Sequence, residues 1–164
     1  MTRARAYLDT CIVSGLAKAD LAPVEQDAVM YLLQAHKQGE LKLVTSAVTA
    51  REISQIPEEF RRAHSVVYSL LSDVPTVLLG STTSLSLMGT PGSGRDDPMF
   101  ESLKCLLPDP QDAEHVFQAA QNGVQYFVTV DRSTMLKHAA KVESACKVKL
   151  VAPSTLKGLV SHAS

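Results

Sequence analysis

The sequence predicts a single α/β domain built around a parallel sheet. Short apolar runs alternate along the chain with longer amphipathic segments, which is the pattern of repeated strand–helix–strand units. The 164 residues suit one domain, and a composition of 45% apolar and 20% charged residues is typical of globular proteins rather than disordered or membrane-spanning ones. Right-handed crossovers would then place helices on both faces of the sheet, as a three-layer α/β/α sandwich.

Five short apolar runs are predicted to be strands. They cover residues 6–8, 41–45, 76–79, 126–130 and 148–151. The first run ends at Asp9 and the fourth at Asp131. In a parallel sheet the functional crevice lies beyond the carboxyl ends of the strands, so both acids are expected at that edge.

The helices between these strands are predicted from apolar residues at helical spacing. The clearest runs from Val24 to Gln38 and stops at Gly39. Another starts at Asp109, a capping residue, with Pro110 at its first helical position. The remaining helices are predicted near residues 46–55, 60–71, 99–106 and 132–141 and after Ser154.

Residues 80–108 interrupt the alternation and are predicted to be an irregular or helical insertion within one domain spanning 1–164. The glycine-rich stretch 89–95 resembles a phosphate-binding loop but lacks its Lys and its Ser/Thr, so nucleotide binding is discounted there. Asp96 and Asp97, a tempting pair of metal ligands, are better explained as turn residues.

The charge and the cysteines limit the classes of function. A net charge of −1 and a pI near 6.5 exclude binding to nucleic acid by bulk positive charge. Metal ions or a local group of basic side chains would have to offset phosphate charge; the candidates are Arg51, Arg61, Arg62, Arg95, Arg132, Lys137 and His138. The cysteines Cys11, Cys105 and Cys146 have no metal-binding spacing and are expected to be reduced thiols. No targeting or membrane-spanning segment is evident, so a cytoplasmic location is expected.

Four acidic residues are candidates for one metal site. Asp112 lies in the first turn of the helix before the fourth strand, and Glu52 lies on the helix after the second strand, one turn beyond Val48 on the same face. If these side chains join Asp9 and Asp131 at one edge, their repulsion favours a divalent cation, about 4 kcal/mol per close pair at an effective dielectric of 20. Carboxylate oxygens are the ligands that Mg²⁺ and Mn²⁺ prefer.

Each acid also has a purely structural explanation. Asp9 and Asp131 precede predicted helices and would serve as helix caps. Asp112 would gain from the helix dipole, although Asp109 already caps that helix. Glu52 alone would be an ordinary solvated residue. Two neighbours, Cys11 and His115, are interpreted respectively as a small buried residue and as a histidine on a helix surface, rather than as reactive groups.

The chain resembles the PIN domain, a metal-dependent ribonuclease family that includes VapC-type toxins of toxin–antitoxin pairs. The matching segments are 7–10 (Tyr-Leu-Asp-Thr), 45–47 (Thr-Ser-Ala) with Glu52, 112–113 (Asp-Ala) and 128–131 (Val-Thr-Val-Asp). The resemblance implies the strand order 3-2-1-4-5, which makes the strands bearing Asp9 and Asp131 neighbours. Many family members have Asn where this chain has Cys11.

Carried over by position, the resemblance implies Asp9, Glu52, Asp112 and Asp131 as ligands of Mg²⁺ or Mn²⁺. Thr129 and Thr10 would support them by hydrogen bonding. The implied activity is hydrolysis of RNA by a metal-activated water, leaving a 5′-phosphate, in a homodimeric toxin with an antitoxin partner and no membrane association. The alternatives are a non-catalytic RNA- or protein-binding module and a DNA-directed nuclease or another phosphohydrolase that uses the same acids.

Overall fold

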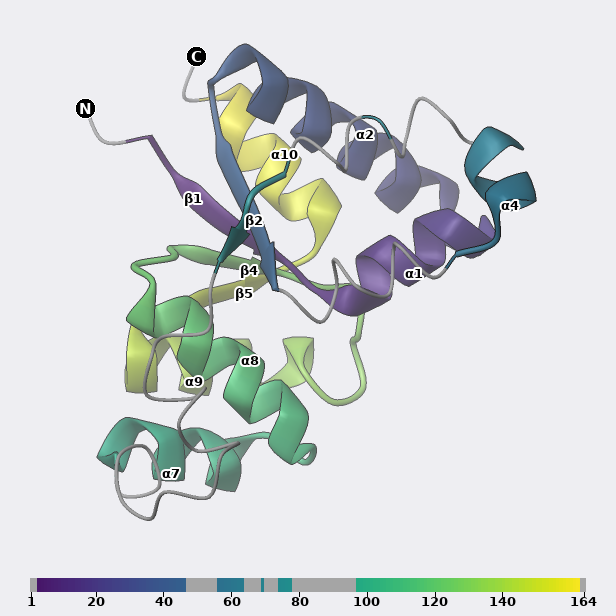
Figure 1. The fold of residues 1–164 in the computed structure, drawn as a ribbon. Coiled ribbons are helices and arrows are strands. Elements are labelled where there is room, and N and C mark those ends of the chain that lie inside the picture. Colours follow the sequence, from purple (N-terminus) through teal and green to yellow (C-terminus); the bar gives the residue numbers. More distant parts are fainter. Residues whose placement is uncertain (1–2, 47–55, 64–68, 70–73, 78–96, 163–164) are drawn as a thin grey trace.

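The computed structural model of the chain describes residues 3–46, 56–63, 69, 74–77 and 97–162. Parallel strands form its centre (Figure 1): β1 (Arg5–Leu8), β2 (Lys42–Ser46), β4 (Tyr126–Val128) and β5 (Lys149–Val151). The α/β class and the parallel sheet are therefore confirmed.

The sheet is narrower than predicted at one edge. The four strands above form a ladder in the order β2-β1-β4-β5, and β3 (Thr76–Val77) adds only a two-residue pairing with the end of β2, which gives β3-β2-β1-β4-β5 overall. The rest of the predicted third strand, residues 78 and 79, lies outside the described residues. In the centre, Tyr7 pairs with Val44 on one side and Phe127 on the other.

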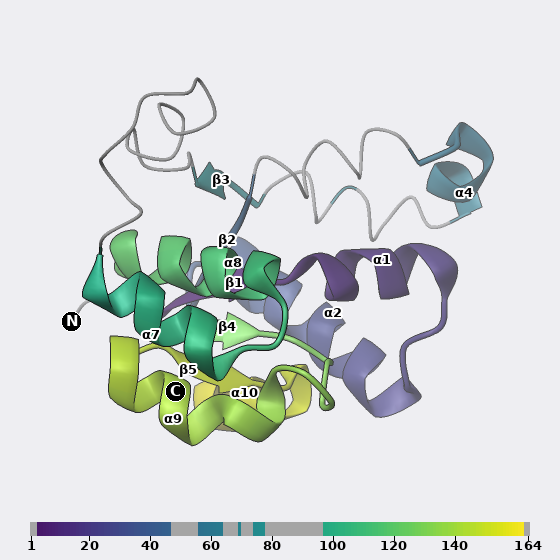
Figure 2. The same ribbon diagram turned by 90° about the horizontal axis from the view of Figure 1, so that it is seen from below.

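Two apolar clusters lie on opposite faces of the sheet because side chains alternate along each strand. Ala6 and Leu8 of β1 belong to one cluster, whereas Tyr7 between them belongs to the other. The first cluster is covered by α1 (Thr10–Lys18), α2 (Pro23–Gln38) and α10 (Pro153–Ser161), and the second by α7 (Pro98–Leu106), α8 (Pro110–Gln121) and α9 (Ala139–Cys146). Figures 1 and 2 show these two groups of helices on either side of the strands.

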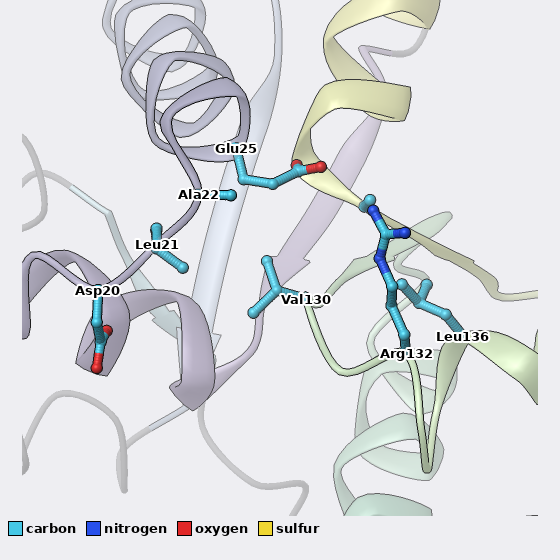
Figure 3. A pocket seen from close by; sticks show the side chains of 8 residues that line it. Asp20, Leu21, Ala22, Glu25, Val130, Arg132 and Leu136 are labelled. Carbon is cyan, nitrogen blue, oxygen red and sulfur yellow. The ribbon is translucent and has the colours of Figure 1, made fainter.

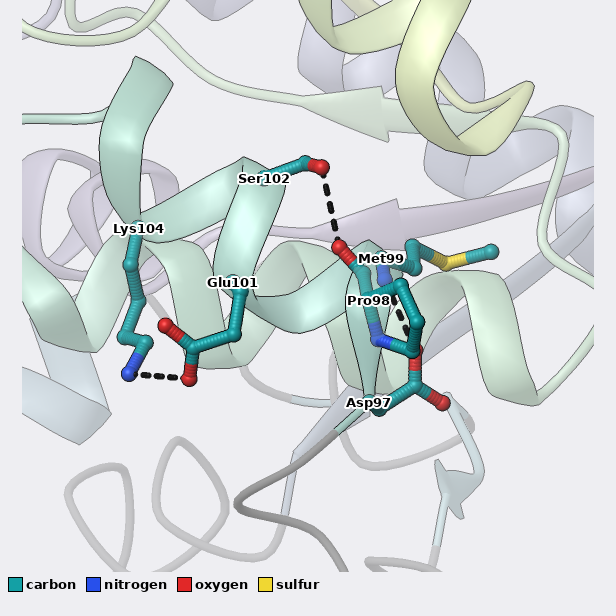
Figure 4. Close-up of polar contacts among 6 residues, drawn as sticks. All are labelled: Asp97, Pro98, Met99, Glu101, Ser102 and Lys104. Atoms are coloured by element: carbon teal, nitrogen blue, oxygen red, sulfur yellow. Dashed lines mark hydrogen bonds and ion pairs between the residues drawn. The ribbon is translucent and has the colours of Figure 1, made fainter.

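The helices begin and end largely where local chemistry predicts. Helix α2 ends at Gly39, whose φ of 78° is the left-handed conformation that glycine adopts most easily. Asp109 caps α8 by accepting a 2.8 Å hydrogen bond from the Gln111 amide, as predicted. Asp97 likewise caps α7 through the Met99 amide at 2.8 Å (Figure 4). Asp97 is thus the N-terminal cap of α7.

The sequence-based prediction was wrong for residues 132–141, where one helix was expected. A turn follows Asp131, then a 3₁₀ helix (Leu136–His138), and only then α9 begins at Ala139. The predicted helix at 46–55 and most of the one at 60–71 lie outside the described residues; α4 (Glu58–Ala63) covers the start of the latter. Of the predicted insertion, the described part is helical from Pro98 to Leu106.

None of the helices in the described part of the chain combines the length and apolar character needed to cross a bilayer. Cys11, Cys105 and Cys146 are free thiols.

Candidate metal site at the carboxyl edge of the sheet

Asp9 lies at the carboxyl end of β1 and is held from the neighbouring strand. Its backbone amide donates to the Val128 carbonyl at 3.0 Å, which continues the pairing of β1 with β4. Its side chain is 8% exposed and makes no capping hydrogen bond to α1, although Asp9 occupies the position before that helix. Capping therefore does not explain this acid.

Thr129 connects Asp9 to Asp131. It is fully buried; its hydroxyl donates to Asp9 Oδ2 at 2.8 Å and accepts a 3.1 Å hydrogen bond from the Asp131 amide. Strand β4 ends at Val128, so Asp131 lies three residues beyond the strand rather than directly at its end. Thr129 thus hydrogen-bonds to one of the predicted ligands, and its supporting role at a metal site stays a prediction.

Asp131 is fixed by the turn that replaces the predicted helix. Its Oδ1 accepts hydrogen bonds from the Ser133 hydroxyl at 3.0 Å and the Thr134 amide at 2.8 Å, and its Oδ2 accepts from the Thr134 hydroxyl at 2.6 Å. Burial alone would raise the pKa of Asp131, but these hydrogen bonds from Thr134 and Ser133 together hold it below its ordinary value. Asp131 is thus kept ionised, and part of its role is to cap this turn.

Asp112 enters the same region from the first turn of α8. Its Oδ2 lies 3.5 Å from the Thr134 hydroxyl, which itself bonds to Asp131. Partial burial, and after it the negative charges of Asp9, Asp109 and Asp131, raise the pKa of Asp112 to about 6, while His115 opposes them. Negative charge from separate segments of the chain therefore accumulates around Asp112.

Cys11 and His115 each make a side-chain hydrogen bond that the sequence did not predict. The Cys11 thiol donates to Asp9 Oδ2 at 3.1 Å; burial, and then the charge of Asp9, raises its pKa to about 12. His115 is partly buried rather than on the helix surface, with Nδ1 3.0 Å from the Tyr7 hydroxyl. Tyr7 is in turn fully buried and stacked on Phe127.

The donor set fits a hard divalent cation in chemistry, since Asp9, Asp112 and Asp131 all offer carboxylate oxygens. Within the described ranges, however, no three His, Cys, Asp or Glu side chains converge closely enough to hold a metal ion by themselves. The fourth predicted ligand, Glu52, lies outside the described residues. Thr10 begins α1 and is partly buried, and its supporting role stays a prediction.

Sequence reasoning missed Ser133 and Thr134 as the groups that orient Asp131. The signal was present, since Asp followed closely by Ser and Thr is typical of a side-chain-bonded turn.

No protein-family model matches the chain, and no curated protein matches it.

Proposed function

We propose that this chain is a divalent-metal-dependent endoribonuclease, with Asp9, Asp112 and Asp131 in its metal site and Glu52 as a fourth ligand. The observation that carries the proposal is geometric: the Thr134 hydroxyl lies 2.6 Å from Asp131 and 3.5 Å from Asp112, and Thr129 connects Asp9 to Asp131. Acids collected at the carboxyl edge of a parallel sheet are costly without a counter-ion, and Mg²⁺ or Mn²⁺ would remove that cost.

The residues of the chain would prepare the site for catalysis. Thr129 holds the Asp9 carboxylate, and Thr134 holds that of Asp131 while lying 3.5 Å from Asp112. Side chains fixed in this way need little rearrangement when a ligand arrives. A bound Mg²⁺ or Mn²⁺ would supply an activated water and stabilise the charge that develops on the phosphoryl group.

The proposal includes the finer features expected of a PIN-type protein. These are a three-layer α/β/α sandwich with a five-stranded sheet, a cytoplasmic location, a homodimer and an inhibitory antitoxin protein. They rest on the resemblance of the segments around Asp9, Asp112 and Asp131. RNA is proposed as the substrate on the same ground.

The proposal is tested by incubating a mixed-sequence RNA with the protein and Mn²⁺. Wild type is expected to cleave it, and EDTA is expected to stop cleavage. Asp9→Asn and Asp131→Asn should each lose at least about a hundredfold in rate, since loss of a ligand should exceed the 10–100-fold typical of supporting residues. Asp27→Asn, which removes an exposed acid from α2, is the matched control. Equal rates for all four proteins would refute the proposal.

A second candidate is a non-catalytic RNA- or protein-binding module with the same fold. It is favoured because, across the described ranges, no three His, Cys, Asp or Glu side chains lie close enough together to hold a metal ion. Titration with Mn²⁺ separates the two, because only a protein with a metal site gains melting temperature as the ion binds the folded state. No gain at millimolar Mn²⁺ would favour the module.

A further inference from the structure

A cavity of about 330 Å³ lies at the carboxyl edge of the sheet, on the side covered by α2 and α10 (Figure 3). It is bounded by the loop between α1 and α2, the beginnings of α2 and α10, and the segment after β4. Val130 and Arg132 both line it, and they flank Asp131 in the chain. The cavity therefore borders the segment that carries Asp131, although none of the three aspartates lines it.

One wall of the cavity carries a buried carboxylate in a fixed orientation. Glu25 is 7% exposed; its Oε2 accepts from the Ser154 amide at 2.9 Å and its Oε1 accepts from the Ser154 hydroxyl at 2.8 Å. A carboxylate oxygen can accept about two hydrogen bonds, so each oxygen retains capacity beyond the bond to Ser154. Glu25 thus offers two adjacent acceptors that are already oriented.

Arg132 also lines the cavity and brings a positive charge to it. Figure 3 shows the Arg132 side chain extending along the cavity toward the beginning of α10. Across the described residues neither Arg132 nor Glu25 takes part in an ion pair. Leu21 and Leu136 add apolar surface suited to a flat ring. Asp20 also lines the cavity, at the end away from Arg132 (Figure 3). A ligand for this cavity should therefore have N–H donors toward Glu25, a planar apolar body and a negative charge at the Arg132 end.

We propose that the cavity binds the nucleotide next to the cleaved phosphate and favours guanine. This inference rests on the proposed function and deepens it. Guanine presents two neighbouring N–H donors on its Watson–Crick edge, which match the two oxygens of Glu25, while Arg132 faces the phosphate. Uracil presents one N–H between two carbonyl oxygens, and those oxygens would face the carboxylate unfavourably.

Binding of mononucleotides tests the inference without any catalysis. In EDTA, guanosine 5′-monophosphate should bind wild type at least about tenfold more tightly than uridine 5′-monophosphate. One bidentate contact to a base edge typically gives this much discrimination between two bases. Nuclear Overhauser contacts should join the guanine ring to methyl groups of Leu21, Val130 and Leu136. Equal affinity for the two nucleotides, or ring contacts elsewhere, would overturn it.

Single substitutions test the roles of the two charged side chains, Glu25 and Arg132. Glu25→Gln keeps the shape and can still bond to Ser154, yet it replaces one acceptor by a donor, so the guanine preference should disappear while the melting temperature is kept. Arg132→Ala should weaken both nucleotides and leave the preference intact. Lys37→Ala, which removes an equal charge from an exposed position in the last turn of α2, is the control and should change neither. A Glu25→Gln protein that keeps the preference would refute the assignment.

The outcome can be separated from that of the nuclease proposal. Guanine-selective binding with no Mn²⁺-dependent RNA cleavage would support the cavity and refute the nuclease. Cleavage that is indifferent to guanine next to the cut, and unchanged in its pattern by Glu25→Gln, would refute the cavity and leave the nuclease standing.

Discussion

Replacing Asp112 by Asn should stabilise the metal-free protein at neutral pH. Asp112 carries a pKa raised to about 6 by partial burial and then by the charges of Asp9, Asp109 and Asp131. The substitution removes the charge but keeps the size and an oxygen that can accept the hydrogen bond from Thr134. The repulsion at this edge of the sheet should therefore fall without loss of packing.

The magnitude follows from proton linkage. Folded Asp112 titrates near pH 6, whereas the unfolded side chain titrates near 3.8, so between these values the folded state binds more protons. The contribution of Asp112 to the free energy of unfolding is therefore fully present below pH 3.8 and is lost as the pH rises through about 6. A difference of about two pH units corresponds to at most about 3 kcal/mol. Because Asp112 is partly exposed, solvent screening reduces the effect to about 1 kcal/mol.

Thermal unfolding in EDTA between pH 5 and 8 measures this effect. At pH 7.5 Asp112→Asn should melt about 2–4 °C above wild type, and the difference should shrink as the pH falls toward 5. Asp27→Asn should match wild type throughout. Saturating Mn²⁺ should raise the melting temperature of wild type more than that of Asp112→Asn and so close the gap. A gap that is absent, or that is the same at pH 5 and pH 8, would refute the electrostatic reasoning.

Three further predictions follow from single contacts. Thr134→Val removes the 2.6 Å hydrogen bond to Asp131, so the pKa of Asp131 should rise toward its ordinary value in a carbon-detected NMR titration; an unchanged pKa would contradict the assigned cause. Burial and the neighbouring acid raise the pKa of Cys11 to about 12, so at pH 8 iodoacetamide should modify the exposed Cys105 well before Cys11, and equal rates by peptide mass spectrometry would count against this. Tyr7→Phe loses a partly buried hydrogen bond and should lower the free energy of unfolding in urea by about 0.5–1.5 kcal/mol; a stabilised variant would contradict that contact.

The sequence predicted the elements whose signals are local. Helix α2 was found from its apolar spacing and Gly39, and α8 from Asp109 followed by proline, because periodicity and capping act within a few residues. The meeting of Asp9 and Asp131 at one edge required the order of the strands. That order came from the resemblance to a known family and not from spacing.

Contacts between distant segments were beyond such reasoning. Glu25 and Ser154 are 129 residues apart, and only the packing of α2 against α10 brings them together. His115 looked like a surface residue because nothing in its helix indicates that it lies against Tyr7. The prediction of a helix directly after Asp131 was wrong for a local reason. The side chain of Asp131 bonds to Ser133 and Thr134 and stabilises a turn where the first helical residues were expected.

Paramagnetic broadening by Mn²⁺ in amide NMR spectra tests most directly whether Asp9, Asp112 and Asp131 share one cation. Substoichiometric Mn²⁺ should first broaden the signals of residues next to these three aspartates, and Asp9→Asn should abolish the effect there. Broadening that begins on another surface, or that persists unchanged in Asp9→Asn, would contradict a shared cation site.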